Sequence, residues 1–164
     1  MPIVKTIKGD LIELFKSGQF PIIAHGANCQ QIMGAGIAKQ IADNFPEVVE
    51  VDQKYPLPAL YRLGDYSATR TQYGIILNFY TQLNPGPNFE YSALKSCLKK
   101  LTMEAISNGN YIELAVPKIG AGIGGGDWDI IKKILNFQEN LLITVVEYDK
   151  GEVRMGEGKT ESAS

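Results

Sequence analysis

Short apolar runs alternate along the chain with segments whose apolar residues recur every three or four positions. The short runs are rich in β-branched residues and predict strands at 3–7, 21–24, 74–80, 111–116 and 141–148. The periodic segments predict helices at 10–16, 36–44, 91–107 and 128–137. Because strands and helices alternate, we expect an α/β fold with a mixed, mostly parallel sheet that helices cover on both faces.

The stretch 46–73 does not follow this alternation. Two prolines, Pro56 and Pro58, and Gly64 interrupt its pattern. We expect a short helix, a turn and an additional strand near residues 60–65 in this part of the chain.

The composition is that of one globular domain followed by a polar tail. The chain has 164 residues, of which 45% are hydrophobic and 21% are charged, which is enough for one core. After Tyr148 the residues are mainly Gly, Glu, Lys and Ser, which bury too little apolar surface to order a chain. We predict a domain over 1–149 and a flexible tail over 150–164.

Charge, cysteine usage and hydropathy limit the partners. The formal net charge is -2, so the chain lacks the basic surplus that neutralises nucleic-acid phosphates, and we expect no strong nucleic-acid binding. Cys29 and Cys97 form no Cys-x-x-Cys pair, which favours reduced thiols in the cytoplasm. No apolar run approaches the ~18 residues of a membrane span, so we expect no membrane partner. The pattern has no heptad seam and predicts no particular oligomeric state.

Two glycine-rich loops each join a predicted strand to a predicted helix. The first follows the strand 21–24 and contains Gly34 and Gly36, and the second, 117–126, contains a run with five glycines among seven residues. Glycine lets a phosphate approach main-chain N–H groups at a helix start, where the helix dipole adds positive potential. Glycines that serve only as tight turns would explain either loop alone. Two such loops at successive strand ends predict a cleft that holds a diphosphate from both sides.

Neither loop carries a familiar nucleotide motif. No Gly-Lys-Ser/Thr follows the glycines, as a P-loop requires, and the Gly-x-Gly-x-x-Gly fingerprint is absent from the first strand. The chain has one histidine, His25, which excludes a multi-histidine metal site, and no acidic cluster has the spacing of a calcium loop or a zinc protease. We therefore predict neither a metal nor a cofactor.

Three sets of residues together resemble the macro domain family. They are Lys-Gly-Asp-Leu at 8–11, His-Gly-Ala-Asn-Cys at 25–29 with Met-Gly-Ala-Gly-Ile-Ala at 33–38, and Pro-Lys-Ile-Gly-Ala-Gly at 117–122 with Gly-Asp-Trp at 126–128. The last two sets are similar to the ADP-ribose 1''-phosphate phosphatase branch of that family. The resemblance extends over residues 1–149 and implies a three-layer α/β/α sandwich that binds ADP-ribose.

The resemblance also implies roles for single side chains. Asp10 matches an acid that accepts a hydrogen bond from the adenine amino group, and the alternative is an N-cap for the helix that starts at Leu11. Asn28 matches the residue that holds the distal ribose, and the alternative is a loop-stabilising asparagine. Tyr148 is a candidate for contact with the adenine face, or else an edge tyrosine packed on the sheet. The implied ligand-binding set, with the two loops at the diphosphate, is Asp10, Leu11, Asn28, Gly34, Ala35, Gly36, Ile37, Gly120, Ala121, Gly122, Ile123, Gly124 and Tyr148.

Two side chains are candidates for catalysis. His25 follows the strand 21–24, beside the expected distal ribose, and its ordinary pKa of about 6.5 suits proton transfer. The alternative is a packed, hydrogen-bonded histidine. Asp127 follows the second glycine loop, where the alternative is the N-cap of the next helix.

The resemblance has one departure that bears on the reaction. Relatives that release ADP-ribose by a covalent route have a lysine and an aspartate where this chain has Gln82 and Gly124, so a Schiff base to that lysine is not available. A direct attack by water remains, assisted by His25 or by the phosphate of the substrate. We expect an enzyme, a phosphatase that hydrolyses ADP-ribose 1''-phosphate to ADP-ribose and phosphate. The alternatives are a non-catalytic ADP-ribose reader and an ADP-ribosyl hydrolase acting on modified protein or nucleic acid.

Overall fold

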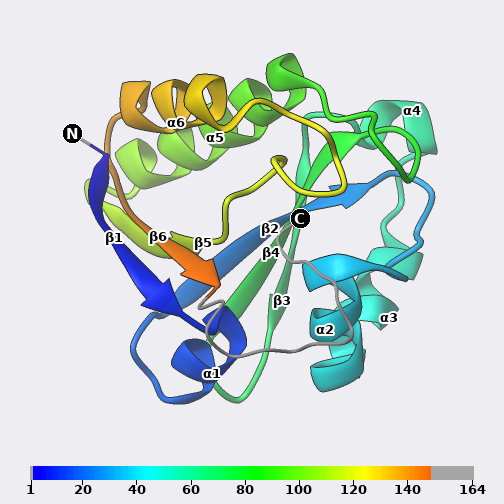
Figure 1. Ribbon diagram of the computed structural model, residues 1–164, viewed down its shortest axis with the longest axis horizontal. Helices are drawn as coiled ribbons and strands as arrows, with labels where there is room; N and C mark the ends of the chain where they lie inside the picture. Colours follow the sequence, from blue (N-terminus) through cyan, green and yellow to red (C-terminus); the bar gives the residue numbers. More distant parts are fainter. Residues whose placement is uncertain (1, 149–164) are drawn as a thin grey trace.

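A central sheet with helices on both sides makes up the fold (Figure 1). The structure, a computed structural model, describes residues 2–148. Its elements in chain order are β1 (Ile3–Gly9), α1 (Leu11–Lys16), β2 (Ile22–Asn28), α2 (Gly36–Asn44), α3 (Pro46–Lys54), α4 (Ala59–Arg62), β3 (Tyr66–Arg70), β4 (Ile75–Gln82), α5 (Tyr91–Ser107), β5 (Ile112–Val116), α6 (Trp128–Phe137) and β6 (Leu141–Tyr148).

The strands form a six-stranded sheet in the order β1-β6-β5-β2-β4-β3. The neighbouring strands pair in parallel except at one edge, where β3 runs antiparallel to β4. The predicted mixed, mostly parallel sheet is therefore confirmed. Because the carboxyl ends of the parallel strands meet at the same edge, the loops that follow β2, β4 and β5 gather on one side of the sheet.

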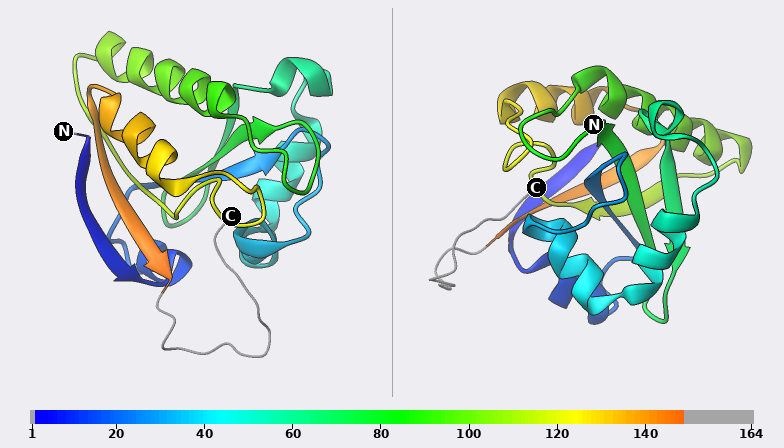
Figure 2. Two further views of the ribbon diagram at one scale, coloured as in Figure 1. Left: turned by 45° about the horizontal axis from the view of Figure 1, so that its top comes forward. Right: turned by 90° about the vertical axis from the view of Figure 1, so that its right-hand side faces the viewer.

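The side chains of successive strand residues pack into two separate apolar layers, one on each face of the sheet. Leu77 of β4 and Leu114 of β5 belong to the layer that contains the buried sides of α5 and α6. Their chain neighbours Ile76 and Ala115 belong to the opposite layer, with α1, α2 and α3. Since side chains of a strand alternate between the two faces of a sheet, the result is the three-layer α/β/α arrangement, which Figure 2 shows in two further views.

The region 46–73 differs in part from its prediction. The expected short helix is present as α3, but residues 59–62 form α4, and the additional strand is β3 at Tyr66–Arg70. The strand predicted near 60–65 was therefore placed too early. The buried face of β3 carries Ser67 and Thr69, so its alternation puts polar residues on the inside, where a hydrophobic pattern does not register them.

Strand β2 is longer than its apolar run. It pairs with β4 as far as the register Asn28↔Gln82, so the strand predicted at 21–24 continues for four more residues. Main-chain pairing with β4 continues the strand here, whatever the side chains are. His25 consequently lies inside the sheet, which corrects the expectation that it opens the first glycine loop.

The remaining predicted strands and helices are present to within a few residues, as β1, β4, β5, β6, α1, α2, α5 and α6. The predicted tail, 150–164, lies outside the described residues. Among the helices of residues 2–148, none has the length and apolar character to cross a membrane.

Candidate functional site

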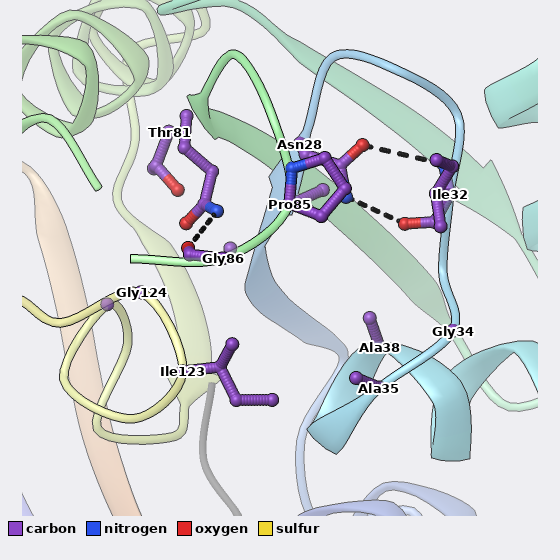
Figure 3. Close-up of a pocket in the computed structure, with 14 residues that line it drawn as sticks. Asn28, Ile32, Gly34, Ala35, Ala38, Thr81, Pro85, Gly86, Ile123 and Gly124 are labelled. Carbon is purple, nitrogen blue, oxygen red and sulfur yellow. Dashed lines mark hydrogen bonds between the residues drawn. The ribbon is translucent and has the colours of Figure 1, made fainter. Parts of the chain in front are cut away.

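A cleft of about 290 Å³ opens at the carboxyl ends of β2, β4 and β5 (Figure 3). The two glycine loops and the connection that follows β4 form its walls. The lining residues are Gly26, Ala27, Asn28, Ile32, Gly34, Ala35, Ala38, Thr81, Gln82, Pro85, Gly86, Gly120, Ile123 and Gly124. None of these side chains is ionisable, so the lining offers a charged ligand only main-chain groups and neutral polar side chains.

The two glycine loops meet at this cleft, as the sequence predicted. Gly36, at the start of α2, has φ +59°, and a Cβ placed on it would lie 3.1 Å from Cδ1 of Ile123 in the second loop. Figure 3 shows the Ile123 side chain pointing toward Ala35 across the cleft. A side chain at Gly36 would be strained by the left-handed backbone and would crowd Ile123, so glycine is required here.

Both loops contain main-chain N–H groups without a partner among the described residues, and both contribute residues to the cleft. Ala35 is the N-cap of α2, and its side chain makes no capping hydrogen bond, so the first-turn N–H groups of α2 are available to a ligand. In the second loop, the hydrogen bonds found within residues 2–148 use none of the N–H groups of Gly122, Ile123 and Gly124. The dipole of α2 adds positive potential at the same place. An anionic group is the ligand that this arrangement suits.

Two other glycines of the second loop serve its internal packing. Gly120 has φ +78°, and a Cβ there would lie 2.5 Å from the Phe89 ring. The Gly126 N–H donates to the Gly120 carbonyl at 2.7 Å, and the Phe89 N–H donates to the Gly124 carbonyl at 3.2 Å. The tight-turn alternative therefore describes Gly126 and part of the role of Gly120, whereas Gly124 faces the cleft.

Asn28 lines the cleft, but its side chain is largely committed to its own loop. Its Nδ2 donates to the Ile32 carbonyl at 2.7 Å, and its Oδ1 accepts from the N–H groups of Gln30 at 2.9 Å and Ile32 at 3.4 Å. Figure 3 shows both bonds to Ile32. The loop-stabilising alternative thus describes the geometry of Asn28, and one N–H of Nδ2 stays open to a ligand.

Two residues at the end of β4, Thr81 and Gln82, bring polar atoms to the cleft that the sequence alone did not assign to a ligand. A Cβ on Gly26 would lie 3.0 Å from Thr81 Oγ1, and a Cβ on Gly124 would lie 3.0 Å from Gln82 Oε1. Gln82 is the register partner of Asn28 on the adjacent strand. The sequence signal that could have found them is their position directly after the apolar part of a central strand.

His25 is wholly buried and does not line the cleft. Its Nε2 lies 2.7 Å from Asn78 Oδ1 of β4, in a hydrogen bond between the two strands. Desolvation by burial lowers the pKa of His25 to about 4, although the bond to Asn78 opposes that shift. Because this pKa lies well below 7, His25 is neutral near pH 7. Its side chain has no access to a water in the cleft, so its geometry is that of the packed, hydrogen-bonded alternative.

The two acids predicted at the site both cap helices. Asp10 Oδ1 accepts from the Glu13 N–H at 3.1 Å at the start of α1. Asp127 Oδ1 accepts from the Asp129 N–H at 2.9 Å at the start of α6. Neither acid lines the cleft. Within the described part of the chain, no group of three or more His, Cys, Asp or Glu side chains is placed to hold a metal ion.

Four other predicted residues do not line the cleft. Tyr148, half-buried, ends β6 in register with Gly9 of β1. Leu11 and Ile37 are buried in the apolar layer beneath α1 and α2, and Ala121 packs against the layer beneath α5 and α6. A ligand can therefore reach Leu11 and Ile37 only through their main-chain atoms.

Known proteins are similar to this chain in sequence and in fold. Residues 24–135 match the family model described as Macro domain. The chain is 42% identical over 153 residues to an uncharacterized 17.5 kDa protein of the tk-vs intergenic region of Enterobacteria phage T4, covering 90% of this chain and 97% of that protein. It is 26% identical over 160 residues to an ADP-ribose 1''-phosphate phosphatase of Lodderomyces elongisporus, covering 89% of this chain and 99% of the phosphatase. The structure of Thermosipho africanus DarTG in complex with ADP-ribose aligns with a TM-score of 0.67 and 20% identity, over 91% of this chain and 42% of that one.

Proposed function

The chain belongs to the macro domain family, and we propose on that premise that its cleft binds ADP-ribose and hydrolyses ADP-ribose 1''-phosphate to ADP-ribose and phosphate. One observation carries the binding part of the proposal. N–H groups at the start of α2 and in the second glycine loop have no hydrogen bond within residues 2–148, and both segments contribute residues to one cleft that has no acidic side chain in its lining. Diphosphate oxygens only accept hydrogen bonds, so they complement such a set of donors.

The order of the strands gives the ligand a direction. Asp10 follows β1 and Tyr148 ends β6 at one edge of the sheet, the two glycine loops follow β5 and β2, and Gln82 ends β4. In the proposed complex the adenine lies toward Asp10 and Tyr148, and the diphosphate lies between the loops. The distal ribose then lies over the end of β4. Asp10 Oδ2 is not used by the capping bond, so it remains available to the adenine amino group.

The phosphatase part of the proposal is supported by two relatives named ADP-ribose 1''-phosphate phosphatase, at 26% and 27% identity. In this reaction a water oxygen bonds to phosphorus, and the bond from phosphorus to the oxygen on C1'' breaks. The water gives one proton to an oxygen of the substrate's phosphate, because buried His25 does not reach the cleft, and a proton passes from the phosphate to the departing oxygen, which leaves as the C1'' hydroxyl of ADP-ribose. Loop N–H groups stabilise the charge on the phosphoryl group as it is transferred.

A second candidate, a non-catalytic reader of ADP-ribose, is favoured by one specific observation. The lining of the cleft contains no ionisable side chain, whereas acid–base catalysis most often uses one. A reader needs only the main-chain donors and the sugar contacts.

Two measurements on the pure protein test the proposal. Isothermal titration with ADP-ribose is expected to give saturable binding with one site per chain. Incubation with ADP-ribose 1''-phosphate is expected to release inorganic phosphate above a blank without protein. Binding without phosphate release would leave the reader, and absence of binding would overturn both candidates. A Gly124→Val variant is the control for both measurements, because a side chain there would fill the space between Gln82 Oε1 and the second loop.

A further inference from the structure

The side-chain amide of Gln82 is held in one orientation at the cleft. Its Nε2 donates to the carbonyl oxygen of Asn84 at 2.8 Å and to that of Gly86 at 2.7 Å. Both donors of the amide are thereby used, and both partners belong to the connection that follows β4. Since the nitrogen is fixed by two bonds, the position of the oxygen is fixed as well.

The oxygen of this amide is the free end. Gln82 Oε1 takes part in none of the hydrogen bonds found within residues 2–148, and a Cβ on Gly124 would lie 3.0 Å from it. Oε1 is therefore an oriented acceptor that faces the second glycine loop inside the cleft. An amide oxygen repels the oxygens of a phosphate, which carry no proton to donate, and it attracts a hydroxyl.

Asn28 does not offer a comparable acceptor. Its Oδ1 already accepts from two N–H groups of its own loop. Thr81 Oγ1, beside Gly26 at the end of β4, is a second oxygen without a hydrogen bond among the described residues. The end of β4 therefore carries side-chain oxygens that can accept a hydrogen bond from a hydroxyl, while the N–H groups of the two loops can donate to an anion.

We propose that Gln82 is a specificity-determining residue, and that its Oε1 accepts a hydrogen bond from a hydroxyl of the distal ribose. This inference rests on the proposed ADP-ribose binding, in which the distal ribose lies over the end of β4. It assigns to Gln82 the discrimination between ADP-ribose and nucleotides that end at the diphosphate. Gln82 thereby contributes a contact to the sugar and none to the diphosphate.

Titration of two ligands against three forms of the protein tests this role. The ligands are ADP-ribose and ADP, which lacks the distal ribose. The proteins are the wild type, Gln82→Met, which removes both the acceptor and the donors at similar length, and Gln82→Glu, which keeps an acceptor and loses the donors to Asn84 and Gly86. The readout is the ratio of the two dissociation constants, because loosening of the loop after β4 changes the affinity for both ligands together.

The wild type is expected to prefer ADP-ribose over ADP. In Gln82→Met this preference is expected to fall about five- to tenfold, the usual size of one lost hydrogen bond. In Gln82→Glu the preference is expected to stay within about twofold of the wild type, although the added negative charge lowers the affinity for both ligands.

An equal loss of affinity for both ligands in both variants would overturn the inference and make Gln82 a purely structural residue. A wild type that binds ADP-ribose and ADP equally would also overturn it, while leaving ADP-ribose binding intact. A wild type that binds neither ligand would overturn the proposed function itself. Thermal melting of each variant shows whether a lost signal comes from unfolding.

Discussion

Arg62 Nη1 donates a hydrogen bond of 3.3 Å to the carbonyl oxygen of Cys29, where β2 ends and the first glycine loop begins. The same guanidinium donates to the carbonyls of Leu57 at 2.8 Å and Tyr55 at 3.2 Å. Arg62 is 6% exposed, so these bonds form away from water. Arg62, the last residue of α4, thus links the connection between α3 and α4 to the start of the loop that forms one wall of the cleft.

Replacing Arg62 should therefore weaken both the fold and the cleft. In Arg62→Met the three carbonyls lose their charged donor, and we expect the free energy of unfolding to fall by about 2–4 kcal/mol. Urea denaturation measures the loss. Arg70→Met, at an exposed arginine of β3, is the matched control and should change stability by less than about 0.5 kcal/mol. Equal effects of the two substitutions would mean that the bonds of Arg62 do not stabilise the loop.

Gly36 should be needed for ligand binding beyond its effect on stability. Gly36→Ala places a methyl group 3.1 Å from Ile123 Cδ1 at φ +59°, whereas Gly109→Ala introduces a methyl at φ +67° with nothing within 4 Å. Both variants are expected to lose about 1–2 kcal/mol of stability from the left-handed backbone. Only Gly36→Ala is expected to lose affinity for ADP-ribose, by about tenfold or more in a titration. Unchanged affinity in Gly36→Ala would show that the close approach of the two loops at Gly36 is not needed for binding.

The sequence predicted the parts of the structure that depend on local pattern. Alternating apolar runs specified the sheet and its two helical layers, and the density of glycine specified the two loops that meet. Strand β3 was misplaced because Ser67 and Thr69 bury polar side chains, one of which bonds to the Tyr80 hydroxyl at 3.0 Å. That partner lies on β4, so no local pattern indicates it.

For the site residues too, the sequence predicted what depends on local pattern and missed what depends on tertiary contacts. The end of β2 depends on main-chain pairing with β4. The local pattern of β2 does not show this pairing, so the prediction ended the strand before His25. The orientation of the Gln82 amide depends on the carbonyls of Asn84 and Gly86, which face it only after the chain turns. Local sequence supplies the donor and acceptor groups, and tertiary structure decides which of them remain free for a ligand.

His25 should make the fold sensitive to acid. Burial lowers its pKa to about 4 from the ordinary 6.5, so the unfolded chain takes up a proton at a higher pH than the folded one. The stability that His25 contributes is therefore complete above pH 6.5 and is lost as the pH falls toward 4, by ~3 kcal/mol in total. Urea denaturation between pH 7 and 4 measures this loss.

A His25→Gln variant isolates that effect from the titration of the carboxylates. The difference in unfolding free energy between the wild type and the variant should shrink as the pH falls through this range. A difference that stays constant would show that His25 takes up its proton equally in the folded and unfolded states.

The two thiols should be unreactive until the protein unfolds. Cys29 and Cys97 are both buried, and burial raises the pKa of Cys29 to about 11 and that of Cys97 as well. Since the thiolate is the nucleophile, reaction with Ellman's reagent at pH 8 should be slow in the native protein and should reach two thiols in guanidinium chloride. Release of two equivalents within the mixing time under native conditions would contradict the burial of these side chains.

Binding of ADP-ribose should depend weakly on salt, because the charge on the diphosphate is met by main-chain dipoles. The residues that line the cleft carry no ionisable side chain, and the nearby Lys39 is paired with Asp43 at 2.8 Å. Salt screens exposed charges most strongly, whereas N–H groups in hydrogen bonds with the ligand are fixed and close to it. Titration in 50 and 500 mM NaCl should therefore change the dissociation constant by less than about threefold. A loss of tenfold or more would mean that an exposed lysine reaches the diphosphate, and repeating the titration with Lys39→Gln would identify it if Lys39 is the residue responsible.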